Sequence, residues 1–194
     1  MADMNDLKER LKQIAEAVRN KLPDIAVTLT ISAKALAERE IRNQGFGSVY
    51  SKNKIPAWFL DGKELNGAGA AWLDAKKKKD AKNTHVQDGQ KFYPADYGTN
   101  WGEFRAAQGL QTAHVDLGYT NMMWSNMQPV RVEQKGDVYL ASLGGTNTET
   151  QDKMNWNRDR YGDFIGKVLT DEHRLLLIDV VVAEVVNVLD QFQP

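Results

Sequence analysis

The sequence predicts an α+β fold in which N-terminal helices and a long C-terminal helix pack on a small antiparallel sheet. Apolar residues recur at helical spacing near both ends of the chain, and two extended runs flank the turn sequence Lys135-Gly136-Asp137. The 194 residues suffice for a single domain, which we expect to span 1–194. A composition of 42% hydrophobic and 26% charged residues is typical of a folded globular protein.

The first expected helix covers residues 6–22. Its apolar residues are spaced three and four apart, and they are Leu7, Leu11, Ile14, Ala15, Val18 and Leu22. Pro23 then breaks the pattern, and because proline is tolerated in a first helical turn, we expect a second helix over 24–43. Gly45 and Gly47 are expected to end that second helix.

Residues 46–103 show no sustained periodicity, so we expect an inserted loop or arm within the domain. Long irregular segments in compact domains are commonly functional loops or partner-binding arms. Short strands are expected around 57–60 and 91–93. Large aromatic side chains are costly to leave in water, so we expect this segment to be ordered in part and to contact other subunits. The candidate interface residues are Trp58, Phe59, Trp72, Phe92, Tyr93 and Tyr97.

Residues 104–127 carry distinctive side chains but no catalytic motif, and we expect them to be scaffolding. A strand should lead into a short helix capped by Thr120, in which Met123 and Met127 share one face. The extended runs 130–133 and 138–142 then predict a hairpin. A polar helix is expected over 149–159.

The C-terminal segment is rich in valine, yet its periodicity predicts a helix. At about 100° per residue, seven polar residues fall within an arc of about 140°: Glu172, His173, Asp179, Glu184, Asn187, Asp190 and Gln191. Thr170 is the expected N-cap, followed by acidic residues that complement the helix dipole. The apolar face is wider than a small sheet requires, so we expect part of it to contact another subunit. Candidate residues are Val181, Val185 and Val188.

No catalytic, cofactor or metal site is expected. The chain has no cysteine, which excludes thiolate chemistry, and its formal net charge of −1 gives no general attraction to polyanions. The three histidines, His85, His114 and His173, lack metal-ligand spacing. Gly67-Ala68-Gly69 lacks the preceding strand of a dinucleotide site.

Two other functions have some support in the residues. Carboxylates among the tryptophans would suit a carbohydrate-active, cell-wall-degrading enzyme, and they are Asp61, Glu64, Asp88, Asp96 and Glu103. The run Lys76, Lys77, Lys78 and Lys79 is the only concentrated positive charge, and it would suit phosphate contacts of a nucleic-acid-binding module. The alternative for the lysines is a solvated face partly offset by neighbouring aspartates.

Two short motifs resemble the phage virion-morphogenesis family, the tail-component, tail-completion and head–tail joining proteins of long-tailed phages. VDLGYTNMMWSNM is similar to that family's D-L-T-x-T-G-x-M-x-x-S element, with matches at Asp116, Leu117, Thr120, Met122 or Met123, and Ser125. Asn121 replaces the glycine, which is tolerable because asparagine also accepts turn conformations. RYGDFIG over 160–166, followed by LTDE, resembles the entry into the family's last helix. The resemblance covers 6–45 loosely and 104–192 better, leaving 46–103 as an insertion or divergent arm.

The resemblance implies a structural virion protein rather than an enzyme, forming a homo-oligomeric ring at the head–tail junction (neck) or the tail end. Its implied partners are copies of itself and portal, connector or tail-tube proteins, with DNA passing through the lumen without specific binding. The charged N-terminus lacks the apolar core of a signal peptide, and no membrane is expected. The expected location is the virion neck or tail, assembled in the bacterial host cytoplasm.

Overall fold

The computed structural model of the chain describes residues 4–45, 50, 52–63, 65–80, 85–87, 90–92, 96–118 and 121–193. Its first half contains α1 (Met4–Gln44), β1 (Lys54–Pro56), α2 (Ala57–Asp61), α3 (Gly67–Asp80), β2 (His85–Gln87), β3 (Gln90–Phe92), β4 (Asp96–Asn100) and α4 (Trp101–Ala107). Its second half contains α5 (Met122–Ser125), β5 (Met127–Lys135), β6 (Val138–Gly145), α6 (Thr148–Tyr161), η2 (Gly166–Val168), α7 (Asp171–Leu189) and η3 (Asp190–Phe192). Helices and small antiparallel sheets confirm the α+β class.

The chain divides into two compact units. Met1–Phe46 and Thr120–Pro194 form the first unit, and Gly47–Tyr119 forms the second. An insertion was expected over 46–103 within one domain, whereas the inserted unit continues to Tyr119. The stretch 104–118 therefore belongs with the inserted unit, and the phrase VDLGYTNMMWSNM straddles the boundary between the two units.

The N-terminal segment forms one helix rather than two. α1 is 41 residues long and contains Pro23 in its interior. An interior proline removes a backbone hydrogen bond and typically costs about 3 kcal/mol. α1 packs against β5 and β6 and also against α7, and Ile25, two residues after the proline, is buried. We attribute the continuity of the helix to this packing, so the prediction of a break at Pro23 was wrong.

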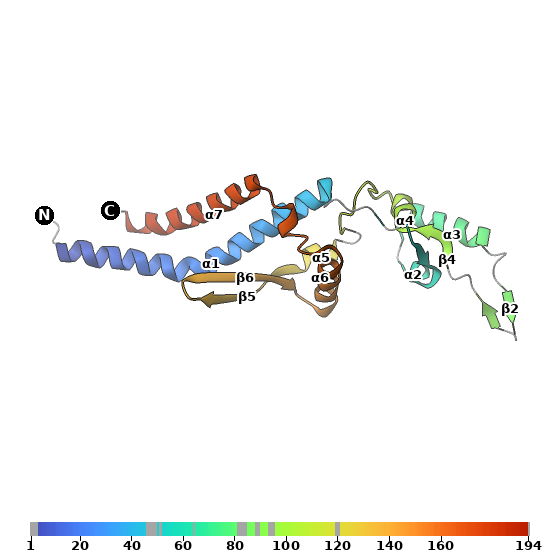
Figure 1. Ribbon diagram of the computed structural model, residues 1–194, viewed down its shortest axis with the longest axis horizontal. Helices are drawn as coiled ribbons and strands as arrows, with labels where there is room; N and C mark the ends of the chain where they lie inside the picture. Colours follow the sequence, from blue (N-terminus) through green and yellow to red (C-terminus); the bar gives the residue numbers. More distant parts are fainter. Residues whose placement is uncertain are drawn as a thin grey trace. The chain divides into compact units, whose positions relative to one another are not determined.

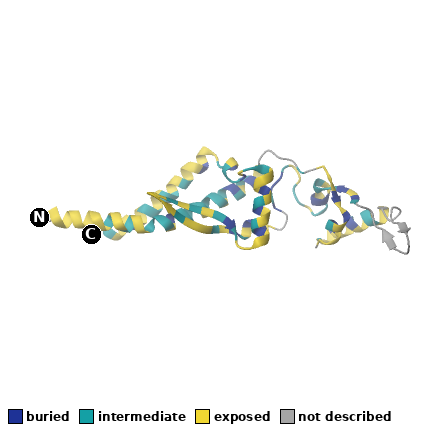
Figure 2. Cartoon of the chain, turned by 60° about the horizontal axis from the view of Figure 1, so that its bottom comes forward, coloured by how far each residue is buried: buried dark blue, intermediate teal, exposed yellow. Residues whose placement is uncertain are grey.

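The hairpin of the first unit confirms the expected turn. β5 and β6 are antiparallel, with Lys135 opposite Val138 and Gly136-Asp137 between them. Gly136 takes φ +62° at the first turn position, where one of the two favoured hairpin turns places glycine. α1 lies between this hairpin and α7 in Figure 1 and packs against both. Figure 2 shows that the N-terminal turns of α1 are mostly exposed.

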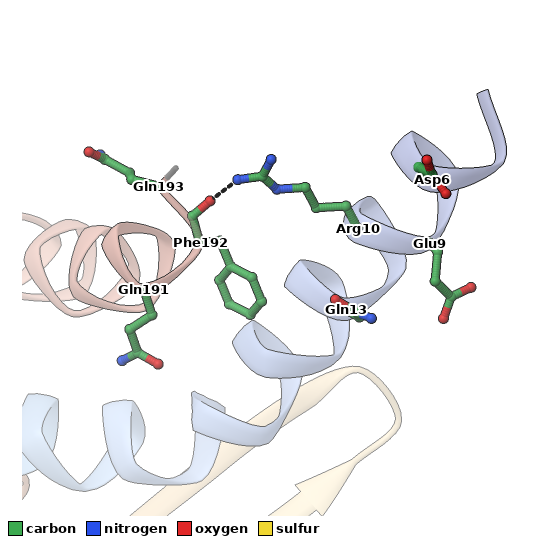
Figure 3. A pocket seen from close by; sticks show the side chains of 7 residues that line it. All are labelled: Asp6, Glu9, Arg10, Gln13, Gln191, Phe192 and Gln193. Atoms are coloured by element: carbon green, nitrogen blue, oxygen red, sulfur yellow. Dashed lines mark hydrogen bonds between the residues drawn. The ribbon is translucent and has the colours of Figure 1, made fainter. Parts of the chain in front are cut away.

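α7 runs antiparallel to α1 and begins as predicted. The Thr170 hydroxyl accepts a hydrogen bond from the backbone N–H of His173, and the His173 ring accepts one from the N–H of Thr170, which makes a capping box. At this end, His173 Nε2 lies 3.9 Å from Glu40 Oε2. At the other end, the Arg10 guanidinium donates to the carbonyl oxygen of Phe192 (Figure 3). The prediction of a C-terminal helix capped by Thr170 is confirmed.

Between the hairpin and α7 lies α6, which confirms the polar helix expected over 149–159 and starts at the N-cap Asn147. The short helix α5 also exists, and its buried Trp124 lies edge-on to Phe164 with ring centroids 6.1 Å apart. Met127, however, opens β5, so it does not share a helical face with Met123 as predicted. The expected cap Thr120 lies outside the described residues.

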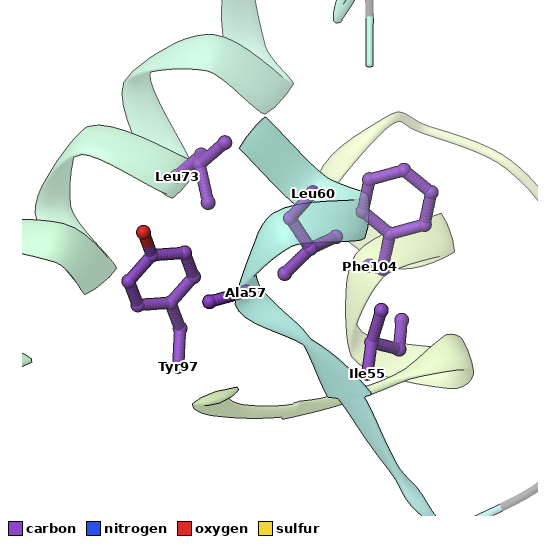
Figure 4. Packing of buried hydrophobic residues seen from close by; sticks show 6 residues of the cluster. All are labelled: Ile55, Ala57, Leu60, Leu73, Tyr97 and Phe104. Atoms are coloured by element: carbon purple, nitrogen blue, oxygen red, sulfur yellow. The ribbon is translucent and has the colours of Figure 1, made fainter. Parts of the chain in front are cut away.

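The inserted unit has a small core of its own. The buried cluster, shown in Figure 4, contains Ile55, Ala57, Leu60, Leu73, Tyr97 and Phe104. β1 pairs with β4, and β2 pairs with β3 close to the strand expected at 91–93. Residues 57–61 form α2 where a strand was predicted, because Ala57 and Leu60 at helical spacing both point into this core. Apart from the 14-residue α3, which contributes Leu73 to the buried cluster, the elements are too short to give the sustained periodicity that sequence reasoning requires.

Candidate assembly surface

α7 carries an apolar stripe that the described parts of the chain leave about half exposed. The stripe is defined by five aliphatic residues that are 39–63% exposed: Leu175, Ile178, Val182, Val186 and Leu189. Their spacing of three, four, four and three residues places them within an arc of about 80° at about 100° per residue. Isolated exposed leucines are normal on protein surfaces, but a contiguous stripe of this kind is typical of an interaction site.

The predicted interface residues of α7 lie on the other apolar side, toward α1. Val188 is only 5% exposed, and Val181 and Val185 are half-buried. His173 at the N-terminal end of the same side is buried as well. Val188 is therefore an interior residue, which corrects its assignment to a subunit interface. The expectation that part of α7 faces outward now rests on the α7 stripe.

The N-terminal turns of α1 form a second exposed apolar row. Met4, Leu7 and Leu11 are 51–79% exposed, and half-buried Ile14 and Val18 continue the same three-and-four spacing. Lys8 and Lys12 flank this row and are themselves exposed. The first unit thus presents two apolar helical surfaces that differ in sequence and in flanking charge.

The aromatic candidates of the inserted unit mostly build its core. Tyr97 is 5% exposed, and Phe59 and Trp72 pack against the same cluster. Trp58 is 74% exposed and is the candidate best placed to meet another molecule. Burial removes Tyr97 from the candidate interface, because the ring already fills the interior. Phe92 lies in β3, and Tyr93 lies outside the described residues.

The lysine run sits at the end of α3, and half of it is engaged within the inserted unit. Lys76 Nζ lies 3.3 Å from Glu103 Oε2, and Lys77 Nζ lies 2.7 Å from Asp61 Oδ1. Lys76 also lies over the Trp72 ring at 5.6 Å from its centroid. Lys78 and Lys79 are exposed. Lys78 and Lys79 are therefore the two lysines of the run that are free to contact a phosphate without breaking one of these ion pairs.

Three of the carboxylates proposed for sugar chemistry, Asp61, Asp96 and Glu103, are engaged in hydrogen bonds or ion pairs. Asp61 accepts hydrogen bonds from the Tyr97 hydroxyl at 3.0 and 3.1 Å, in addition to its lysine. A hydrogen bond from Thr99, aided by Lys76, lowers the pKa of Glu103. A glycosidase acid needs a raised pKa, so Glu103 is tuned in the wrong direction for that role. Asp96 lies 3.6 Å from Lys54, and Glu64 and Asp88 lie outside the described residues.

The most elaborate polar arrangement is a buried network that sequence reasoning missed. The Arg105 side chain donates to the carbonyl oxygens of Gln111 at 3.0 Å and Gly118 at 2.9 Å, and to Asp116 Oδ2 at 2.7 Å. Asp116 Oδ1 accepts from the Tyr50 hydroxyl at 2.8 Å and from the Gly118 N–H at 2.9 Å. The Tyr50 ring also lies under the guanidinium, 4.7 Å from centroid to Cζ. We call Tyr50, Arg105, Asp116 and Gly118 the clasp.

The clasp ties together the two ends of the inserted unit. Tyr50 lies near the start of that unit and Gly118 near its end. Leu117 between the clasp residues takes φ +52°, a left-handed conformation that costs about 1–2 kcal/mol for a residue with a Cβ. Burial raises the pKa of the Tyr50 hydroxyl, which stays protonated and donates. Every side chain of the clasp is used in a structural contact, so it offers no free group for catalysis.

Elsewhere the described chain offers little chemistry. An open pocket of about 430 Å³ lies where α1 begins and the chain ends, and its lining is mainly polar: Asp6, Glu9, Arg10, Gln13, Gln191, Phe192 and Gln193 (Figure 3). It brings together no nucleophile and base. Within the described ranges, no three His, Cys, Asp or Glu residues are grouped so that they could hold a metal ion.

The comparisons with known proteins gave no match, so a function has to be argued from the geometry of the chain. No family model matches the chain, and neither the curated proteins nor the solved structures gave a match. None of the helices that the structure describes is both long enough and apolar enough to cross a membrane. The α7 stripe and the apolar row of α1 are therefore the features from which a function can be argued.

Proposed function

We propose that this chain is a structural subunit that assembles with copies of itself into a ring at the head–tail junction or tail end of a tailed phage or prophage particle. The observation that carries the proposal is the α7 stripe. Fully burying one large aliphatic side chain contributes about 1.5–3 kcal/mol. Five half-exposed residues would then contribute roughly 4–7 kcal/mol when covered, against the entropic cost of association.

The particle assignment is supported by the two short resemblances to virion-morphogenesis proteins. The first motif leads through Asn121 into α5 and the hairpin, and the second occupies the connection from α6 to α7. Both stand in the first unit or at its edge, in the part of the chain that carries the exposed helical surfaces. Copies of the chain are the first partners we propose, with portal, connector or tail-tube proteins next along the particle.

The competing functions gain no support from specific contacts. Lys76 and Lys77 are occupied by carboxylates, which weakens the case for a nucleic-acid-binding module. Asp61 and Glu103 are engaged in hydrogen bonds and ion pairs, which weakens the case for a carbohydrate-active enzyme. We therefore retain the assembly subunit as the single proposal.

The test is the mass of the protein in solution and its presence in particles. Light scattering coupled to size exclusion should give a multiple of the 21.8 kDa chain, and electron microscopy should show rings. Mass spectrometry of purified particles from the host should find the protein in several copies per particle. A chain that stays monomeric at all concentrations and is missing from purified particles would overturn the proposal.

A further inference from the structure

We infer that the α7 stripe of one copy packs antiparallel against the N-terminal apolar row of α1 in a second copy. The inference rests on the self-assembly proposed above and names the two surfaces that meet. The contact joins two different surfaces. Each copy therefore uses its α7 stripe to bind one neighbour and its α1 row to bind another. Contacts of that type build rings or filaments, whereas a surface that pairs with itself builds closed dimers.

The first argument for this pairing is the charge that lies beside the α7 stripe. Going around α7 by about 100° per residue, the side away from α1 borders the stripe with acidic residues. Glu172 and Asp179 lie on this border, and Asp190 continues it near the C-terminal end. All three are exposed. The α7 stripe therefore has one acidic edge, and its other edge adjoins the α1-facing side.

The apolar row of α1 has the opposite charge on its corresponding edge. Lys8, Lys12 and Arg19 lie about 80–120° around the helix from the centre of the row, in the same rotational sense in which the acids lie from the centre of the α7 stripe. All three are exposed, and none of them makes an ion pair with another described residue. The two surfaces thus match in shape, as apolar helical rows, and are complementary in charge.

Helix geometry decides between the possible partners. When two helices pack antiparallel, edges that lie in the same rotational sense meet each other, as in antiparallel coiled coils. An antiparallel α7–α7 pair would bring the acidic edge of one helix against the acidic edge of the other, which is destabilising. An antiparallel α7–α1 pair brings the same acids against lysine and arginine. With Leu11 opposite Val182, Lys12 comes near Asp179 and Arg19 near Glu172.

The orientation also suits a closed ring. Within one copy, α7 is antiparallel to α1, as the contacts at Glu40 and Arg10 establish. If α7 is also antiparallel to the next α1, the α1 helices of neighbouring copies point the same way. Neighbouring subunits of a many-membered cyclic ring are related by a small rotation, which keeps their helices nearly parallel.

Disulfide trapping tests the contact directly, because the chain has no cysteine. Within one copy, Arg10 contacts Phe192 and Glu40 lies beside His173, so Leu11 lies near the C-terminal end of α7, far along the helix pair from Val182. A Leu11→Cys/Val182→Cys chain can therefore be bridged at these positions only between copies. Oxidised as the full-length assembly, it should give a ladder of covalent multimers on a denaturing gel. Thr148→Cys/Val182→Cys, with an exposed site on α6, is the matched control and should give no ladder.

Val182→Cys alone separates the α7–α7 alternative. Position 182 is the centre of the α7 stripe, so a two-fold α7 pair would give a single covalent dimer, and that result would overturn the inference. An assembly seen by light scattering without a Leu11–Val182 bridge would also overturn it while leaving the proposed function standing. If wild type neither associates nor occurs in particles, the proposed function fails and the inference fails with it.

Charge exchange provides a second measurement. Lys8→Glu/Lys12→Glu and Glu172→Lys/Asp179→Lys should each weaken association by about tenfold or more, because like charges then meet across the contact. Combining all four changes should restore association to within about threefold of wild type. Sedimentation velocity at several salt concentrations supplies the readout. If the two sets of changes act independently and the combination is weaker still, the two edges do not face each other.

Discussion

The Arg105 Nη2 atom lies 2.7 Å from Asp116 Oδ2, and the two residues are only 3% and 7% exposed. Burying two charges costs several kcal/mol unless the remaining donors and acceptors are satisfied. Here Nε, Nη1 and Nη2 of the arginine each have an acceptor, and both carboxylate oxygens accept hydrogen bonds. The inserted unit has a small apolar core, so we expect the clasp to be a main determinant of its stability.

Removing the arginine should destabilise the inserted unit strongly. In Arg105→Met the Asp116 carboxylate remains buried without its cation, and breaking a buried pair in this way costs about 3–5 kcal/mol. The matched control is Lys54→Met, which breaks an exposed pair with Asp96 in the same unit and should cost about 1 kcal/mol or less. Urea unfolding followed by tryptophan fluorescence measures both. Equal losses in the two variants would contradict a stabilising clasp.

The clasp should also make the inserted unit sensitive to acid. Burial disfavours the charged form of Asp116, but hydrogen bonds from Gln111, Gly118 and Tyr50, together with Arg105, outweigh it and lower the pKa below the ordinary 3.8. A lowered folded-state pKa contributes stability that is present above the unfolded-state value and is lost as the pH falls through the folded-state value. The unfolding free energy should therefore fall below about pH 4.

The matched variant for the acid prediction is Asp116→Asn. It lacks the titrating group, so its unfolding free energy should be lower at neutral pH and should change less between pH 5 and 3. Glu103, whose pKa is also lowered, titrates in the same range. Glu103→Gln is therefore the control that measures how much of the pH dependence comes from Glu103. A wild-type and an Asp116→Asn protein with parallel pH profiles would show that Asp116 is not responsible.

Gly109 ends α4 in a conformation that depends on glycine. It takes φ +71°, and its N–H donates to Ala106 while the N–H of Leu110 donates to Arg105, the pattern of a Schellman cap. Gly67 offers a comparison, since a Cβ would meet nothing within 4 Å at either residue and Gly67 does not have a positive φ. Gly109→Ala should cost about 1–2 kcal/mol. Gly67→Ala should be neutral or stabilise by up to about 1 kcal/mol.

The two glycine positions differ mainly in backbone conformation. The difference between the unfolding free energies of the two variants, measured with denaturant, therefore reports the cost of a side chain at positive φ. Because the Gly109 cap holds the Arg105 end of α4, the Gly109→Ala loss should shrink in an Arg105→Met background, where the clasp is already broken. Strict additivity of the two changes would mean that the cap and the clasp stabilise the unit independently.

The features that the sequence predicted correctly are those set by local chemistry. Thr170 followed by Asp171 and Glu172 identifies a helix start, and Gly136-Asp137 between extended runs identifies a hairpin turn. Each depends on residues a few positions apart, whose preferences the surrounding fold reinforces. The same reasoning failed at Pro23, where packing against the hairpin and α7 outweighs a local helix breaker.

The candidate site was harder to place, because periodicity gives the angles around a helix but not which side is covered. α7 is apolar over most of its circumference, and Val188 and Val182 look equivalent in sequence although one is buried and the other exposed. The clasp was missed for another reason. Tyr50 and Asp116 are 66 residues apart, and only the fold of the inserted unit brings them together.

The lysine run provides the last prediction, because its four members divide into two pairs. Lys76→Gln/Lys77→Gln removes both ion pairs to carboxylates, and since exposed pairs contribute about 1 kcal/mol at most, the loss of stability should be small but measurable. Lys78→Gln/Lys79→Gln should leave stability unchanged. Fluorescence anisotropy with duplex DNA should show weak binding at most for wild type and both variants. Steep, salt-dependent binding that is abolished only in the Lys78→Gln/Lys79→Gln protein would instead establish a phosphate contact at the end of α3 and revive the nucleic-acid hypothesis.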